Sequence, residues 1–219
     1  MKKHLPILVI LLLSCFVAQG QIKVGVKGGL NVSTFSYEPP TGFDDLDIGA
    51  LAGFHLGGFV NFGINDNWGV QGELMYSNQG GTITRTDIST GQSIEIEARR
   101  RLNYLSLPAL MKYHSNSGVT FEAGPVFDFL LRGNESYDVN VDLAGFAIDD
   151  ENVTDDHLGV DVKLAVGAGY ELASGLSFNL RYSFSLSSTL DEDGENFLEG
   201  EEASINLFQL SAGFPLYAR

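Results

Sequence analysis

The stretch Leu176-Ser177-Phe178-Asn179-Leu180-Arg181-Tyr182-Ser183-Phe184-Ser185-Leu186 alternates apolar and polar side chains at every position. Successive side chains of a β-strand point to opposite faces of the sheet, so the apolar side chains here share one face and the polar ones share the other. The pattern predicts a strand with one apolar and one polar surface.

Seven further segments show the same period of two. Together they predict strands over residues 22–33, 50–62, 68–79, 102–113, 119–132, 160–172, 176–186 and 204–216. The alternation is weakest in 204–216 and in 102–113, which Pro108 interrupts. Eight strands of this kind indicate an all-β protein.

The connections between these segments alternate in length. The short ones cover residues 63–67, 115–118 and 173–175, and the long ones cover residues 36–49, 80–99, 133–159 and 187–203. Within the long connections, residues 82–87 and 93–97 resemble a protruding hairpin, and Tyr137, Val139 and Val141 continue the alternation of the fifth segment. Tight periplasmic turns and long outer loops are typical of barrels in outer membranes. We therefore expect an eight-stranded antiparallel up-and-down transmembrane β-barrel with short periplasmic turns and long acidic outer loops.

The beginning of the chain has the features of a secretory signal peptide. Lys2 and Lys3 precede an apolar run over residues 5–13, and Ala18-Gln19-Gly20 supplies a small-x-small cleavage site. The run is too short to span a bilayer as a helix. We expect export to the outer membrane of the cell.

This division leaves a signal peptide over residues 1–20 and a barrel domain over residues 21–219. The single cysteine, Cys15, falls in the signal peptide, so the barrel domain has no disulfide and no cysteine-based metal or redox site. The whole chain has 13 basic and 28 acidic residues and a formal net charge of −15. Such acidity argues against nucleic-acid binding, which requires a basic surface to neutralise phosphates.

A soluble lipocalin or β-sandwich also alternates, so the composition of the two faces has to distinguish these folds. The polar face mixes glycines with isolated charges of both signs, which suits a narrow interior filled by its own side chains. Unpaired charges inside would be costly to desolvate, so we predict an interior ion-pair network in which the two signs balance. Its expected members are Lys23, Lys27, Glu73, Glu122, Asp128, Arg132, Asp161, Lys163, Glu171 and Arg181.

The apolar face carries aromatic residues near the strand ends. They are Trp68, Tyr76, Tyr104, Tyr170 and Tyr182. Aromatic girdles lie at both membrane interfaces of outer-membrane barrels, so we expect these five side chains to face lipid.

Four segments resemble the PorT-like outer-membrane β-barrel proteins of Bacteroidota. They are Ile22 to Asn31, similar to the first strand of that family, Tyr104-Leu105-Ser106-Leu107-Pro108, similar to its Tyr-Leu-x-x-Pro segment, and Glu122-Ala123-Gly124-Pro125 and Gly167 to Leu172, similar to its fifth and sixth strands. The resemblance covers the whole barrel domain. It implies an outer-membrane barrel and, as in one relative, a component of a protein secretion apparatus.

No catalytic or metal-binding motif stands out, and we expect neither enzyme activity nor a cofactor. His157 beside Asp155 and Asp156, with Ser136 near the same rim, is the arrangement most similar to that of lipid-modifying barrels, but no Gly-x-Ser-x-Gly motif marks a nucleophile. Weak candidates for a divalent cation are Asp191, Asp193, Glu195, Asp149 and Asp150, which lack the spacing of a calcium loop.

Most of the negative charge falls in three long connections. Residues 36–49, 133–159 and 187–203 contain 4, 8 and 7 acidic residues and no Lys or Arg, which leaves a net charge of +2 for the rest of residues 21–219. Loops of this kind attract cations within a Debye length of about 8 Å. We expect a structural or surface-interaction protein that contacts outer-membrane lipid and, through these loops, other envelope proteins or extracellular ligands. A secretion component, a narrow channel and a lipid-modifying enzyme are the alternatives.

Overall fold

The computed structural model describes residues 21–36, 46–87, 94–141, 144–152, 160–186 and 204–218, and the expected signal peptide lies outside them. These residues form one antiparallel sheet. Its strands are β1 (Ile22–Ser36), β2 (Leu46–Gly63), β3 (Trp68–Asp87), β4 (Ile94–His114), β5 (Val119–Val141), β6 (Ala144–Asn152), β7 (Val160–Glu171), β8 (Ser177–Ser185) and β9 (Ser204–Ala218).

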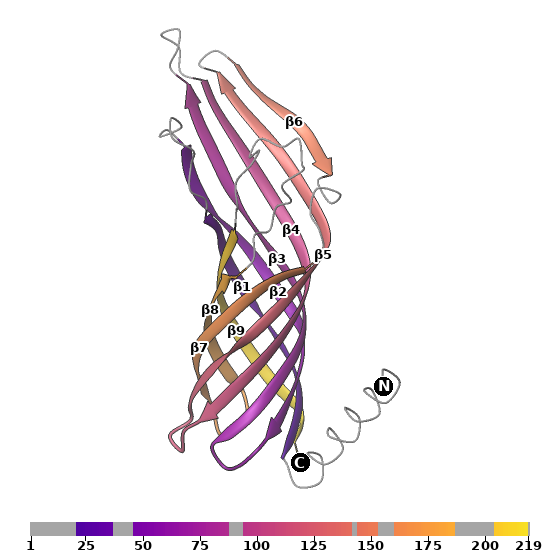
Figure 1. The fold of residues 1–219 in the computed structure, drawn as a ribbon, viewed down its shortest axis with the longest axis vertical. Helices are drawn as coiled ribbons and strands as arrows, with labels where there is room; N and C mark the ends of the chain where they lie inside the picture. Colours follow the sequence, from indigo (N-terminus) through magenta and orange to yellow (C-terminus); the bar gives the residue numbers. More distant parts are fainter. Residues whose placement is uncertain are drawn as a thin grey trace, which may run out of the picture.

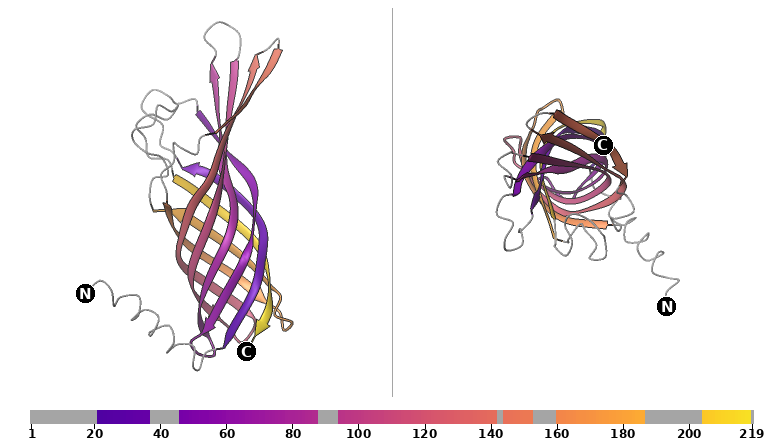
Figure 2. Two further views of the ribbon diagram at one scale, coloured as in Figure 1. Left: turned by 90° about the vertical axis from the view of Figure 1, so that its right-hand side faces the viewer. Right: turned by 90° about the horizontal axis from the view of Figure 1, so that it is seen from above.

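Eight of these strands close into a ring (Figures 1 and 2). Neighbours along the chain pair with each other, except that β5 pairs with β7 in the ring and β9 pairs with β1. The seam between the first and last strands runs from Lys23↔Ala218 to Ser36↔Ser204, with one shift of register between Val24 and Gly25. The eight-stranded antiparallel barrel predicted from the sequence is confirmed.

The strand β6 lies outside the ring. It pairs only with the outer part of β5, from Asn134↔Asn152 to Val141↔Ala144. Residues 133–141 and 144–152 therefore form two paired strands within the long connection predicted over 133–159; the continuation of the fifth strand was expected, whereas β6 was not predicted. The alternation that continues past the fifth segment explains why β5 is so long.

The three short connections lie at one end of the barrel, together with the C-terminal end of β9 (Figure 1). In the turn between β4 and β5, the Gly118 amide donates to the Ser115 carbonyl (3.0 Å). Gly118 has a φ of 89°, a left-handed conformation that favours glycine. This end is the periplasmic one in an outer-membrane barrel.

At the opposite end, β3, β4 and β5 continue beyond the ring (Figures 1 and 2). The pairing of β5 with β7 stops at Phe129↔Val160, whereas β3 and β4 stay paired as far as Asp87↔Ile94. The protruding hairpin expected from residues 82–87 and 93–97 is confirmed for its described part.

Large apolar side chains cover the outward face of the ring. Leu30 is 65% exposed and Leu56 62%, and most outward positions of the ring strands are similarly apolar. Exposing an apolar surface of this extent to water would be unfavourable, whereas contact with lipid is favourable. The described residues include no helix long and apolar enough to cross a membrane. Four of the five predicted girdle aromatics, Trp68, Tyr76, Tyr170 and Tyr182, are on this outward face.

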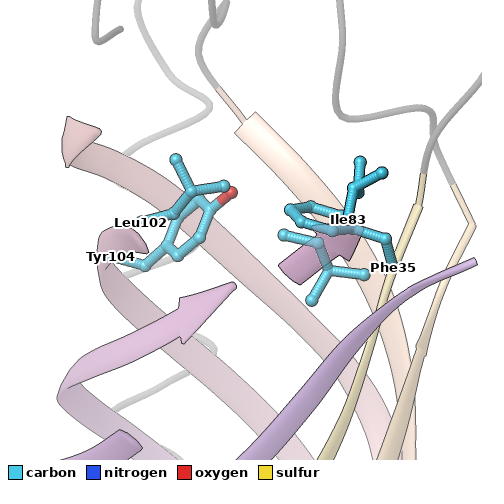
Figure 3. Close-up of a cluster of buried hydrophobic side chains, with 5 residues drawn as sticks. Phe35, Ile83, Leu102 and Tyr104 are labelled. Carbon is cyan, nitrogen blue, oxygen red and sulfur yellow. The ribbon is translucent and has the colours of Figure 1, made fainter. Parts of the chain in front are cut away.

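Tyr104 is the exception, because it is 2% exposed and points inward. It packs with Leu102, Phe35, Ile83 and Ile205 in an apolar cluster at the outer end of the interior (Figure 3). The prediction that Tyr104 faces lipid is therefore wrong. Residues 102–113 have apolar side chains on both faces, so the period of two does not determine their phase, and a shift of one residue reverses every side chain.

Candidate functional site

The interior of the barrel below the apolar cluster is occupied by charged side chains. At its centre, the fully buried Glu73 carboxylate of β3 accepts hydrogen bonds from three neighbours. Lys27 Nζ lies 3.0 Å from Oε1, Gln71 Nε2 lies 2.7 Å from Oε1, and the Arg181 guanidinium donates to both oxygens at 2.8 and 2.9 Å. The two-pronged contact from Arg181 is the strongest geometry that a carboxylate can receive.

Arg181 also connects Glu73 to a second carboxylate. Its Nε donates to Glu122 Oε1 of β5 at 2.7 Å, and Lys112 Nζ of β4 is 3.9 Å from Glu122 Oε2. These side chains meet because each occupies an inward position on its strand. The bridges run across the barrel between β3, β5 and β8, and they fill its centre.

A second group lies toward the outer end. Lys163 of β7 is fully buried, and its Nζ is 2.8 Å from Asp128 and 3.2 Å from Asp161. The same ammonium donates to Gln79 Oε1 at 2.5 Å and lies 5.3 Å from the centre of the Tyr104 ring. Asp128, Asp161 and Gln79 thus surround the ammonium and replace its hydration shell.

A third group lies near the short turns. Lys23 Nζ of β1 donates to Glu171 Oε1 of β7 at 2.6 Å, and His114 Nε2 is 3.5 Å from Glu171 Oε2. This pair is partly exposed, with side-chain exposures of 30% and 21%. The ion pairs that the structure describes inside the ring thus join five basic side chains to five carboxylates.

Nine of the ten residues predicted for the interior ion-pair network form ion pairs inside the ring, whereas Arg132 lies outside it. Arg132 is exposed, and its Nε donates to Asn134 Oδ1 at 2.9 Å. The cause is a β-bulge, because Asn103 pairs with Arg132 while Tyr104 pairs with Leu130. Leu131 is the extra residue, and it shifts every later side chain of β5 to the opposite face.

Sequence reasoning missed Lys112, which takes the position in the charge balance that Arg132 was expected to hold. Lys112 is 4% exposed and lies on β4, the strand with the weakest alternation. An even spacing of eight places Lys112 on the same face as Tyr104, but the sequence assigned Tyr104 to the lipid face, so this spacing could identify Lys112 only once the phase of β4 was known.

A group of uncharged polar residues next to the centre contains a serine, a histidine and an asparagine. His55 Nδ1 lies 2.7 Å from Asn31 Oδ1, and His55 Nε2 lies 2.9 Å from Ser211 Oγ. Because the amide oxygen only accepts, Nδ1 carries the proton, and Nε2 accepts from the serine hydroxyl. The order of nucleophile, base and orienting group is that of a hydrolase triad, but all three side chains are at most 3% exposed.

The remaining candidates from the sequence are only partly described. His157, Asp155 and Asp156 lie outside the described residues, as do Asp191, Asp193 and Glu195, and the side chains of Asp149 and Asp150 on β6 lie outside them as well. Ser136 is on β5, paired with Arg99. No group of three metal-ligating side chains occurs within the part of the chain that the structure describes.

A closed antiparallel ring with an apolar outer surface and a charged, filled interior is the organisation of a transmembrane β-barrel. The chain belongs to the family described as outer membrane protein beta-barrel domain, whose model matches residues 17–191. The protein is therefore an outer-membrane protein, as the sequence predicted.

Comparison with solved structures finds outer-membrane proteins at low sequence identity. The attachment invasion locus protein Ail of Yersinia pestis is 13% identical, with a TM-score of 0.44 over 90% of this chain and 99% of that one. Neisserial surface protein A is 12% identical (TM-score 0.40; 90% and 99% covered), and OprG of Pseudomonas aeruginosa is 11% identical (TM-score 0.40; 90% and 96% covered). No curated protein matches the sequence.

Proposed function

We propose that this protein is a non-enzymatic outer-membrane barrel with a structural or surface-interaction role. The observation that supports this proposal is the packing of the interior. Among the described residues, two cavities lined by these charged side chains measure about 10 and about 20 Å³. Each has room for about one water molecule, which is too little for a continuous path for ions or solutes.

Electrical recording tests the filled interior. The refolded protein in a planar bilayer should give no steady ion conductance, because the pairs around Glu73 and Lys163 cross the barrel. Insertion is verified on the same sample by heat-modifiable gel migration. A reproducible unitary conductance from the inserted protein would support the narrow channel instead.

The Ser211–His55–Asn31 group gives the most direct test of the non-enzymatic part. All three side chains are buried inside the ring, so an ester cannot reach the Ser211 hydroxyl, and a fluorophosphonate probe, which reacts with activated serines, should not label the protein. Labelling that disappears in Ser211→Ala would show a reactive serine and would contradict the proposal.

Surface interaction is tested by photo-crosslinking from the acidic connections. A photoreactive residue placed within 36–49, 133–159 or 187–203 should give adducts with envelope proteins or extracellular ligands in intact cells. The matched control places the same group at Asn116 in the short turn between β4 and β5, on the periplasmic side. Identical adducts from both ends would contradict a role specific to the outer loops.

A further inference from the structure

Arg99, Arg101 and Arg132 lie near one another where β3, β4 and β5 leave the ring. Three successive rows of paired residues cross these strands: Asn78↔Asn103↔Arg132, Gly80↔Arg101↔Asn134 and Thr82↔Arg99↔Ser136. The rows lie on the outward face, because Gln79, Arg100, Leu102 and Gly133 between them are buried. The surface therefore presents three guanidinium groups at adjacent positions.

The rows enclose a pocket of about 480 Å³. Its lining is polar throughout and consists of Asn78, Arg99, Arg101, Asn103, Asn134 and Ser136. The volume is in the range of small-ligand sites. Two guanidinium groups, three amides and a hydroxyl therefore supply the hydrogen-bond donors that line this pocket.

Hydrogen bonds fix the amides that border this pocket. The Tyr76 hydroxyl donates to Asn103 Oδ1 at 2.8 Å, and Asn78 Nδ2 donates to the same oxygen at 2.7 Å. Arg132 Nε donates to Asn134 Oδ1 at 2.9 Å. These amide and guanidinium side chains are thus held in place before any ligand binds, which lowers the entropic cost of binding.

The positive charge of the pocket is only partly neutralised. Arg99 Nη2 is 3.1 Å from Glu97 Oε1, but Arg99 Nε is buried and has no acceptor among the described residues. Neither Arg101 nor Arg132 forms an ion pair within that same part of the chain. A buried guanidinium donor without an acceptor is unfavourable, and a phosphate can accept hydrogen bonds from two such donors at once.

The pocket begins where the apolar surface ends. On β3 the outward residues run from Trp68 through Tyr76, which is the last aromatic, to Asn78. The ten steps from Trp68 to Asn78, at ~3.4 Å each on a strand tilted by ~40°, span about 26 Å along the membrane normal, which matches the ~25 Å height of the apolar band of such barrels. The arginines therefore lie at the level of the outer-leaflet headgroups.

We propose that this pocket binds the phosphate of an outer-leaflet lipid headgroup. Basic pockets at membrane boundaries recognise phosphorylated headgroups. A lipid reaches the pocket sideways from the bilayer, next to Tyr76. Residues 36–49, 133–159 and 187–203 hold 19 acidic residues and no Lys or Arg, and this negative charge opposes the approach of a free anion from the outer side.

Native mass spectrometry of the folded protein in non-ionic detergent tests the proposal, with diphosphorylated lipid A and its dephosphorylated form as probes. The phosphorylated form should bind about 10-fold more tightly or better, and Arg101→Gln should remove about 10-fold of that affinity. Glu97→Gln frees Arg99 from its carboxylate and should strengthen binding. Heat-modifiable migration verifies folding of each variant, and Glu97→Gln still tests the site if Arg101→Gln does not fold.

Two control variants make the same changes of net charge at the periplasmic turns. Asn116→Asp matches Arg101→Gln, and Asp66→Asn matches Glu97→Gln; both positions are exposed, and both controls should leave the affinity unchanged. Equal effects in variant and control would mean attraction by net charge alone and would overturn the proposal. Equal affinity for both forms of lipid A would also overturn it, as would displacement of the lipid by millimolar inorganic phosphate.

Discussion

The substitution Glu73→Gln should destabilise the folded barrel, because two buried cations, Lys27 and Arg181, each lose a negatively charged partner. The side chain keeps its shape but loses the charge that faces Lys27 and Arg181. Glu122 is then the only carboxylate bonded to Arg181 within the described interior, and Lys27 loses the sole carboxylate that it contacts there. Both cations stay buried, with exposures of 3% and 4%.

The magnitude follows from the cost of leaving charges buried without a partner. Removing one member of a buried pair costs about 3–5 kcal/mol. The amide that replaces the carboxylate retains one acceptor oxygen, so the lower half of this range is the expected loss, about 3–4 kcal/mol. With a urea dependence of ~2 kcal/mol per molar, the unfolding midpoint should fall by about 1.5–2 M.

The assay is urea unfolding of the barrel in lipid vesicles, followed by tryptophan fluorescence of Trp68 and by gel migration. Glu97→Gln is the matched control, because the same chemical change breaks the partly exposed pair with Arg99 and should cost about 0–1 kcal/mol. Adding Lys27→Met to Glu73→Gln removes a stranded cation and should recover part of the loss. A loss below about 1 kcal/mol in Glu73→Gln, or no recovery in the double variant, would refute the reasoning.

Three further substitutions probe other parts of the interior. Lys163→Met removes the ammonium that pairs with Asp128 and Asp161 and should cost about 3–5 kcal/mol in the same urea titration; a neutral effect would mean that water screens the ammonium. Gly29→Ala drives a methyl group into the Leu210 carbonyl oxygen at the β1–β9 seam and should reduce the heat-modifiable fraction on refolding, whereas Gly72→Ala meets nothing within 4 Å and should refold normally. Tyr104→Phe removes a buried hydroxyl that has no partner among the described residues, so stability should stay within about 1 kcal/mol of the parent; a larger loss would reveal a hydrogen bond to that hydroxyl.

For strands whose two faces differ in polarity, the sequence alone was enough to assign each side chain to the inward or the outward face. In β8 every inward residue is polar and every outward residue is apolar, so the period of two assigned Arg181 to the interior directly. In β4 the inward face holds Leu102, Tyr104 and Leu110 together with Lys112, and neither face is distinctive. The phase of such a strand is decided by its register with its neighbours, and register is a property of the closed ring.

Arg132 shows a different limit. Up to Leu130, β5 follows strict alternation, and one inserted residue then reverses the faces. A bulge leaves no reliable trace in hydrophobic periodicity, because Leu131 is an acceptable outward residue with or without it. The hydrogen-bond partners could not be predicted from the sequence either, since the pairing of Glu73 with both Lys27 and Arg181 depends on the diameter of the ring.

The net negative charge of the chain alone would predict repulsion from an anionic membrane surface, but the location of the positive charges alters this expectation. The described interior pairs cancel, and Asp66 near the periplasmic turns offsets Arg219. The residual charge of +2 therefore comes from residues 85–101 and Arg132, on the outer parts of β3, β4 and β5, whereas Glu135 and Asp138 of β5 are counted in the acidic segment 133–159. A uniformly acidic protein would repel an anionic membrane surface, whereas in this chain the described interior pairs cancel, Arg99, Arg101 and Arg132 lie on the outward face at the membrane boundary, and most acidic residues fall in residues 36–49, 133–159 and 187–203. Since screening limits each layer to about 8 Å, an outer-leaflet phosphate responds to the arginines beside it and not to the total charge. Affinity for phosphorylated lipid should accordingly follow substitutions in the arginine rows and be insensitive to equal changes of charge at the opposite end of the barrel.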